Sequence, residues 1–550
     1  MWSTTPFSLL NAHSGLIALF LLSILVIVVR RSRHISLGYL PGPPSTSFIL
    51  GNMRELSDVT VGELALEWTS RYGPVFKHKG TFGEDRLMIS DPKALQYIFN
   101  TAAYSFQKPE DARASLREMN GPGILWAEGD VHKGQRRVML PAFGGPESRA
   151  LFPVFKTIVE RLISCWRDIV NNHTGQGRGW AEIDVRAWLS RATLDAIGEA
   201  AFDYNLDTLS GTDTDLASAY RALSGEPLST FRLLYEGIMY HMPGFIVTWI
   251  FKKMPMEQFK LLRQARRSSN SVAKHLIQTK ISELQDGKSR HDVMSLLVRA
   301  NSSHAVKGRL TDEELYAEMS IILQAGHETT SNSLTWILYE LARNPVIQDR
   351  LRKEITEALD VVRSRGDQDL TLHDLEQMPY FQAVLKEGLR LHPAVPSTVR
   401  VAAEDTVIPL SKPILITSGA MIQELPVAKG TFITPCYGCY NRDKELWGAD
   451  ADQFNPNRWL DKEGMSRKAS SLGVVGNLMT FSSGQRSCIG WRFAMSEMHC
   501  FLAELVKNFE FSIDPAMRIV KRGTGVVAPK VVGEEGMGLR LPLRISVLDS

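Results

Sequence analysis

The stretch FSSGQRSCIG, residues 481–490, sets one cysteine between two glycines and two residues after an arginine. Apolar residues at helical spacing follow from Ala494 to Phe509, which predicts a helix beginning just after Cys488. A cysteine at a helix N-terminus has a lowered thiol pKa, and the thiolate is the form that ligates a metal. A lone cysteine, however, is more often a small buried side chain. The residues alone leave both interpretations of Cys488 open.

The composition excludes several classes of protein. The chain has 550 residues, of which 44% are hydrophobic and 22% are charged, as in ordinary globular proteins. Its formal net charge of +3 is almost neutral for this length, so no nucleic-acid partner is expected. The five cysteines are too scattered for a disulfide framework, which indicates a reducing compartment. Cys436-x-x-Cys439 has the spacing of half a zinc site or of a redox pair, but the sequence holds no second pair.

The N-terminus predicts a membrane anchor. Residues 15–29 (GLIALFLLSILVIVV) form an apolar run that, extended back to Leu9, is long enough to cross a hydrocarbon core of about 30 Å. The basic segment RRSRH follows it, so the remainder of the chain is expected in the cytosol. We expect an anchor over 1–35 with the span at about 9–29, a proline-rich linker over 36–59, and one domain over 60–550.

The remaining pattern predicts an α+β fold in which helices dominate. The clearest helix covers 312–343, with a capping box at Thr311 and Glu314 and a stop at Asn344-Pro345. A second helix is predicted at about 376–391. Short β-like runs lie near 75–90, 398–435 and 539–547.

The long helix is interrupted by QAGHETT, residues 324–330. Two small residues there leave the backbone uncovered on one side, and an acid and two hydroxyls follow. This pattern fits a helix–helix crossing with a polar stripe. It also fits a buried acid beside a hydroxyl that carries protons into a closed site.

Several motifs, taken together, resemble the cytochrome P450 family of heme-thiolate monooxygenases. Phe481, Gly484, Arg486, Cys488 and Gly490 match its F-x-x-G-x-R-x-C-x-G signature. Four further landmarks lie upstream in the order of the family: His132-x-x-x-Arg136, Ala325-Gly326-His-Glu328-Thr329-Thr, Glu387-x-x-Arg390, and FNPNRW with Arg458. The resemblance covers about residues 40 to 530 and is greatest to membrane-bound fungal members.

The resemblance implies a role for each of these residues. Cys488 would be the axial ligand of heme b iron, and thiolate ligation favours O–O cleavage. Glu328 and Thr329 would deliver protons to bound oxygen. Glu387, Arg390 and Arg458 would form a buried structural network. The heme itself would be held by His132, Arg136, Ala325, Gly326, Arg400, Phe481, Gly484, Arg486 and Gly490.

The implied partners are O2, a membrane, a lipophilic small molecule and a separate NADPH–cytochrome P450 reductase. No dinucleotide-binding motif follows the heme region, and the chain ends about 60 residues beyond Cys488. The reductase is expected on the basic face of Lys133, Arg136 and Arg137. The same residues fit equally well a heme-propionate partner with a solvated face. The apolar segment 231–251 is expected either to roof the substrate pocket and touch the bilayer or to be core helix. Ile322, Ala325, Val395, Thr398 and Val399 are expected to line the pocket.

These features predict a single-pass protein of the endoplasmic reticulum that oxidises a terpenoid, fatty acid, sterol or polyketide, as in secondary metabolism. Two alternatives stay open. One is a heme-thiolate isomerase, dehydratase or peroxygenase that works without a reductase. The other is a membrane-tethered heme carrier or sensor that is not an enzyme.

Overall fold

The structure is a computed structural model that describes residues 36–58, 60–174, 179–211, 230–253, 257–285, 292–302, 309–461, 472–523 and 525–548. The predicted anchor, 1–35 with its span at about 9–29, lies outside these residues. Among the residues that the structure describes, we find no helix with the length and apolar character needed to cross a membrane.

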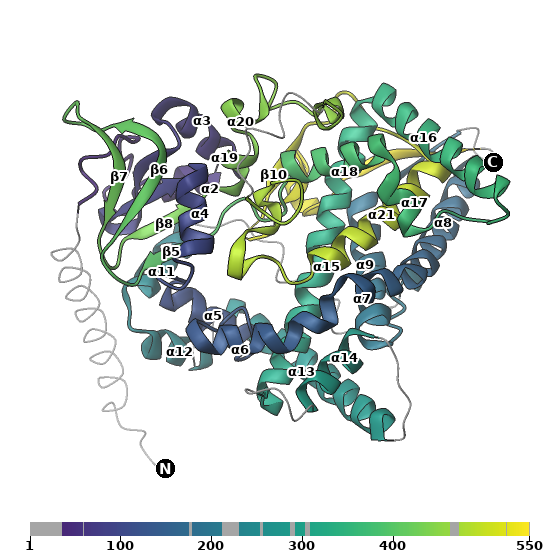
Figure 1. Ribbon diagram of the computed structural model, residues 1–550, viewed down its shortest axis with the longest axis horizontal. Helices are drawn as coiled ribbons and strands as arrows, with labels where there is room; N and C mark the ends of the chain where they lie inside the picture. The colour runs from purple at the N-terminus through teal and green to yellow at the C-terminus, as the bar shows by residue number, and fades with distance from the viewer. Residues whose placement is uncertain are drawn as a thin grey trace, which may run out of the picture.

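One long helix, α15 (Asp312–Arg343), runs through the middle of the helical part of the molecule (Figure 1). The Thr311 hydroxyl accepts from the Glu314 amide, and the Glu314 carboxylate accepts from the Thr311 amide, so the predicted capping box is confirmed. The helix ends at Arg343, before Asn344 and Pro345, as the sequence predicts. Its closest neighbour is α9 (Val185–Phe202).

Other helices surround α15 and confirm a mainly helical fold. The helix predicted after Cys488 is α21 (Trp491–Asn508), and the one predicted near 376–391 is α18 (Pro379–Leu391), preceded by α17 (Leu372–Gln377). The other longer helices are α3 (Glu63–Tyr72), α5 (Glu110–Asn120), α6 (Gly129–Met139), α8 (Phe152–Thr174), α11 (Thr230–His241), α12 (Gly244–Lys253), α13 (Glu257–Gln285), α14 (Val293–Ser302) and α16 (Pro345–Ser364). Short helices include α2 (Met53–Asp58), α4 (Pro92–Gln96), α7 (Gly145–Ala150), α19 (Tyr437–Asn441) and α20 (Lys444–Trp447).

The strands form small sheets, the largest of which has the order β1-β2-β8-β5-β3. Its strands are β1 (Val75–Lys79), β2 (Asp85–Ile89), β8 (Phe432–Pro435), β5 (Arg400–Ala402) and β3 (Phe106–Gln107). A hairpin of β6 (Thr406–Leu415) and β7 (Met421–Val427) lies beside it at the edge of the molecule (Figure 1). The other sheets are β4-β12-β9 (Ala181–Asp184, Pro542–Val547, Phe509–Ser512) and β10-β11 (Ile519–Arg522, Ala528–Val531).

A single large apolar cluster joins the helices to the sheets. It includes Phe155 of α8, Leu338 of α15, Phe501 of α21 and Ile89 of β2, all of which are at most 1% exposed. Packing of this kind removes apolar surface from water. Two smaller clusters lie apart from it, one around Trp68 and one around Met239. The loop before α21 is held against α6, where Arg136 donates to the Ser487 carbonyl oxygen, and against residues 99–103.

Candidate active site

The loop that carries Cys488 is shaped by a glycine. Gly484 has a φ of +60°, and a Cβ there would lie 2.2 Å from both the Asn100 Oδ1 atom and the Phe99 carbonyl oxygen. Glycine is therefore required by both conformation and space. The Cys488 amide then donates to the Phe481 carbonyl at 2.9 Å, which closes the loop just before α21 begins.

The side chain of Cys488 is exposed, yet burial raises the pKa of its thiol above the ordinary value. The open space beside it is therefore internal. A hydrogen bond from the Gly490 amide and the charge of Arg136 act in the opposite direction. The sequence predicted a lowered pKa, and this was wrong for the thiol as such, because desolvation outweighs the helix terminus. A coordinating metal deprotonates a thiol outright.

Two basic residues of α6 lie against this loop. Arg136 donates to the Ser487 carbonyl oxygen at 2.8 Å and to the Ser487 hydroxyl at 3.1 Å, immediately before Cys488. His132 is 4% exposed, and its Nδ1 atom is 2.9 Å from the Tyr104 hydroxyl. The i, i+4 spacing in α6 places both side chains on one face of the helix.

Two further arginines approach from other elements. Arg486 donates from Nε to the Ala103 carbonyl at 3.0 Å, and its Nη2 atom pairs with Glu128, while Nη1 is buried without a hydrogen bond. Arg400, in β5, donates to the Thr398 hydroxyl at 2.7 Å and to the Val399 carbonyl at 2.8 Å. The structure therefore pairs Arg486 with a carboxylate that the sequence interpretation missed.

Lys108 completes this cluster. Its ammonium donates to the Ala127 carbonyl at 2.7 Å and lies 3.5 Å from Glu128. Burial, with the charges of Arg486 and Arg400, lowers the pKa of Lys108 to about 7. Burial and the charges of Arg486 and Lys108 likewise lower the pKa of His132 to about 3. Desolvation is the main cause of both shifts, and the positive charges of Arg486, Lys108 and Arg400 act in the same direction, so an anion would be stabilised here.

These residues fit heme. Its two propionate carboxylates would meet the positive cluster, which consists of Lys108, Arg136, Arg400 and Arg486 against Glu128, with the neutral His132 beside it. The buried Nη1 atom of Arg486 has a hydrogen bond left to donate. Cys488 supplies a sulfur ligand beside the internal opening. Sequence reasoning missed Lys108 and Glu128; the lysine in the segment FQKPED and the acid just before the HKGQRR helix were the available signals.

The interrupted part of α15 also borders open space. Ala325 is exposed although most residues of this helix are buried, and the partly exposed Thr329 donates its hydroxyl hydrogen to the Ala325 carbonyl at 2.8 Å. Gly326 lies where α15 crosses α9. A Cβ there would lie 2.8 Å from Ile197 of α9, so the crossing requires a small residue, and the heme contact of Gly326 stays a prediction. The interpretation of this segment as a helix–helix crossing therefore applies to Gly326. The interpretation as a hydroxyl beside a site applies to Thr329 and Ala325.

Glu328 is held by an arginine that the sequence interpretation did not include. Its carboxylate lies 3.6 Å from the Arg186 guanidinium, and both side chains are at most 20% exposed. Arg186 stands at the start of α9, beside the β4-β12-β9 sheet. To transfer a proton to another group, Glu328 must first leave this arginine.

The structure brings Glu387, Arg390 and Arg458 together. Arg390 donates to both carboxylate oxygens of Glu387 at 2.8 Å, and Arg458 donates to Oε1 at 2.8 Å. Trp459 donates its indole N–H to Oε2 at 2.9 Å. Glu387 and Arg390 are fully buried, so these mutual contacts are what makes their charges tolerable.

Of the expected pocket residues, Ile322 is buried and Val395, Thr398 and Val399 are half-buried.

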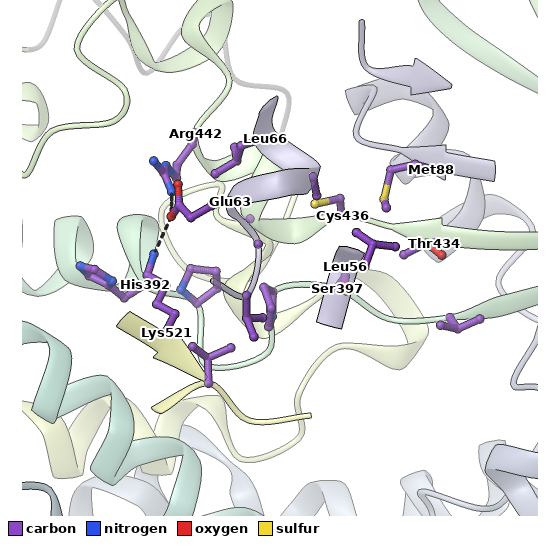
Figure 2. A pocket seen from close by; sticks show the side chains of 18 of the residues that line it. Leu56, Glu63, Leu66, Met88, His392, Ser397, Thr434, Cys436, Arg442 and Lys521 are labelled. Atoms are coloured by element: carbon purple, nitrogen blue, oxygen red, sulfur yellow. Dashed lines mark hydrogen bonds and ion pairs between the residues drawn. The ribbon is translucent and has the colours of Figure 1, made fainter. Parts of the chain in front are cut away.

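Val399 also borders a separate cavity of about 240 Å³, which we call the α3 cavity. Its walls come from α2, α3, the five-stranded sheet, the end of α18 and β10, and its charged residues include Glu63, Arg442 and Lys521 (Figure 2). Glu63 accepts from Arg442 at 2.8 Å and lies 3.6 Å from Lys521. Cys436 lines this cavity, and the structure joins Cys436 to Cys439 in a disulfide.

Comparison with known proteins gives one consistent result. The family model "Cytochrome P450" matches residues 41–531. Cytochrome P450 monooxygenase 205 of Postia placenta is 34% identical over 521 residues, which cover 92% of each chain. Cytochrome P450 monooxygenase claP of Ampulloclitocybe clavipes is 32% identical over 543 residues, which cover 96% of each chain. Because both the model and these fungal relatives span nearly the whole chain, the protein belongs to the cytochrome P450 family of heme-thiolate oxidoreductases, in which a cysteine is the axial ligand of the iron.

Proposed function

We propose that this chain inserts one oxygen atom of O2 into a lipophilic small molecule, such as a terpenoid of secondary metabolism, with electrons from NADPH through a separate reductase. One observation carries the proposal. Thr329 and the exposed Ala325 border open space on α15, and Glu328, the next acid along the helix, lies 3.6 Å from the Arg186 guanidinium. An isomerase or a heme carrier has less need of this acid–hydroxyl pair.

Each residue around the site has a separate role in the proposed reaction. Heme, when bound, supplies the reduction of O2 and the transfer of one of its atoms. Arg136 fixes Ser487, and the Gly490 amide donates to the Cys488 sulfur, which together hold the thiolate in place. Thr329 redirects its hydroxyl from the Ala325 carbonyl to an oxygen or water beside it. Glu328 releases Arg186 and carries a proton to Thr329 from outside the site.

The reductase would dock on the α6 face. Lys133 is 48% exposed and pairs with Asp130 at 2.9 Å, and Arg137 is exposed. The neighbouring Arg136 reaches inward to Ser487, so this face connects the surface with the cysteine loop. A basic surface of this kind steers an acidic flavoprotein toward it.

Membrane contact is supported by α12. Phe245 is 76% exposed and Trp249 is 53% exposed, and Lys252 and Lys253 follow them in the last turn. Phe48, before α2, is 79% exposed. Aromatic residues with adjacent lysines are typical of helices that lie in a membrane interface. With the predicted anchor, this supports an endoplasmic reticulum protein whose catalytic domain is cytosolic and whose substrate enters from the bilayer.

The test is reconstitution of the full chain with heme, reductase, lipid vesicles and a library of terpenoids, fatty acids and sterols under isotopically labelled O2. We expect a product with one labelled oxygen, formed only with NADPH and reductase. Thr329→Ala should keep substrate binding and NADPH use but lose product by about 10-fold or more, as for loss of an acid–base group. Turnover without reductase would favour the isomerase or peroxygenase alternative. Full product formation by Thr329→Ala would overturn the proposed proton route.

A further inference from the structure

We propose that Cys436 and Cys439 form a thiol–disulfide exchange site, which reacts with small-molecule disulfides and thiols through the α3 cavity and transmits its state to the loop of Cys488. The heme-thiolate reaction does not use this pair. The structure joins the two cysteines in a disulfide with a Cα–Cα distance of 5.3 Å, and Cys165, Cys488 and Cys500 are free. The distance is normal for a disulfide.

The local backbone favours reaction at Cys436. This residue follows β8 and precedes α19, and the Cys439 amide donates to its sulfur at 3.2 Å. An N–H donor stabilises a thiolate, and the C-x-x-C arrangement lowers the pKa of its first cysteine in known exchange sites. In the reduced state Cys436 is therefore the nucleophile, and Cys439 is the resolving thiol one helical turn away.

The α3 cavity gives access to this sulfur. Cys436 is 3% exposed and lines the cavity, as Figure 2 shows, whereas Cys439 is 1% exposed. At the charged end of the cavity, the Glu63 side chain is 41% exposed, so the cavity reaches the surface there. Its volume of about 240 Å³ is below the about 300–1,000 Å³ of pockets for drug-sized ligands. The reagent that fits is thus a small disulfide or thiol, not a protein.

The exchange balances with a small disulfide as the oxidant. The Cys436 thiolate attacks one sulfur of that disulfide, its S–S bond breaks, and one thiol leaves with a proton. The Cys439 thiolate then attacks the Cys436 sulfur, the protein disulfide forms, and the second thiol leaves. Two protein thiols are oxidised and one external disulfide is reduced to two thiols.

The pair is linked to the heme loop through α19. The Tyr437 hydroxyl is 3.1 Å from the Ser482 hydroxyl, and Ser482 has a φ of +59° in the loop before Cys488. Asn441 donates to the Thr480 hydroxyl at 2.9 Å, and its Oδ1 atom accepts from the Met479 amide at 3.0 Å. A disulfide that closes the start of α19 restrains these donors and acceptors, whereas two free thiols let the helix end loosen.

The first test measures the state of the pair directly. Heme-loaded full-length protein is equilibrated in buffers of cysteamine and its disulfide cystamine, which are small enough for the α3 cavity, then quenched with acid, unfolded and alkylated. The mass of the peptide that contains residues 436–439 is then measured by mass spectrometry. We expect the pair to change reversibly between dithiol and disulfide in a two-electron transition. The ratio of the two forms should change tenfold for each change of about 30 mV in buffer potential. Cys165→Ser should titrate identically, and Cys436→Ser and Cys439→Ser should lose the transition. A pair that stays reduced in every buffer overturns the proposal.

The second test measures the coupling. Heme transfer to excess apomyoglobin is timed for the oxidised and reduced forms of the same protein. We expect about fivefold faster transfer after reduction, the equivalent of about one net hydrogen bond. Tyr437→Phe removes the contact with Ser482, so it should reduce this ratio while leaving the midpoint of the cysteamine–cystamine titration unchanged. Equal transfer rates of the two forms, with a normal midpoint, would overturn the coupling and leave the exchange site.

Discussion

Two buried carboxylates of this protein lie in opposite electrostatic surroundings. Glu387 accepts five hydrogen bonds, two from Arg390 and one each from Arg458, Trp459 and the Asn455 amide. Glu128 faces a positive cluster that it does not balance (Lys108, Arg136, Arg400 and Arg486). We call the group around Glu387 the closed network, because its charges have their partners within the protein. We call the group around Glu128 the open cluster, because positive charge there lacks a counter-charge.

The difference separates a structural network from a binding site. At Glu387, each charge already has its partners within the protein, and the backbone carbonyls of Asn441 and Ala451 accept from Arg390 as well. At Glu128, the pKa of Lys108 is lowered to about 7, and a buried nitrogen of Arg486 has no partner. A buried cluster with excess charge is costly until a counter-charge joins it. We therefore expect the two regions to respond differently to substitution.

The largest effect is expected from Glu387→Gln. The substitution leaves Arg390 and Arg458 buried without their shared counter-charge, so we expect it to lower the free energy of unfolding by about 3–5 kcal/mol, with or without heme. Urea unfolding of the apo-protein and the heme-loaded protein measures this. The control is Glu357→Gln, whose side chain is 67% exposed and 3.8 Å from Lys353. That exposed pair should contribute less than about 0.5 kcal/mol. Equal losses in both variants would show that the Glu387 network has no special role.

The next effect is expected from Arg486→Leu and should separate stability from heme binding. Because the cluster has excess positive charge, loss of this guanidinium should change apo-protein stability little, while Lys108 still neutralises Glu128. Heme affinity should fall by about 10- to 100-fold, as for a charged hydrogen bond of about 1.5–3 kcal/mol. Heme transfer to apomyoglobin measures it. Arg492→Leu is the control, since Arg492 is an exposed arginine stacked on Trp491 near the same loop. Unchanged heme affinity in Arg486→Leu would argue against the cluster as the propionate site.

The sequence predicted the closed network better than the open one. Glu387 and Arg390 are one helical turn apart in α18, and the FNPNRW segment supplied Arg458, so fixed local spacing gave the partners. The capping box of Thr311 and the helix after Cys488 were predicted for the same reason. Local patterns of this kind are determined by neighbours in the chain.

The open cluster depends on contacts between segments distant in the chain. Glu128 and Arg486 are separated by 358 residues. Nothing in the local pattern of either predicts that they meet, because the packing of α6 against the cysteine loop decides it. The packing of Gly326 is another such contact: the sequence shows that α15 carries small residues there but not that Ile197 of α9 lies against them. The disulfide of Cys436 likewise follows from the turn between β8 and α19.

The third prediction uses pH to sharpen the comparison. The folded-state pKa of Lys108 is about 7, below the ordinary value of about 10.4, so between these values the unfolded apo-protein binds more protons than the folded one. Stability from this group therefore rises with pH in that window, and the penalty is fully present below pH 7. From pH 7 to 9, we expect the apo-protein to gain up to about 2 kcal/mol relative to Lys108→Met.

Urea unfolding at both pH values measures this difference. Bound heme should reduce it, because propionates stabilise the charged ammonium. Lys133→Met is the control, since its ammonium is 48% exposed on the same side of the molecule and pairs with Asp130. If Lys108→Met and the parent protein show the same pH dependence, the cluster around Glu128 has no excess of positive charge. It would then not differ electrostatically from the network around Glu387.

The smallest effect is expected at the rim of the closed network. Asp450 contacts Arg458 at 2.9 Å, but its side chain is 37% exposed. Water therefore replaces much of what Asp450→Asn removes, and Arg458 keeps Glu387 and the backbone carbonyl of Asp450. We expect a loss below about 1 kcal/mol in urea unfolding, at most a third of that for Glu387→Gln. A loss as large as that of Glu387→Gln would mean that the closed network extends to the surface, because its stability would then depend on a charge that solvent already reaches.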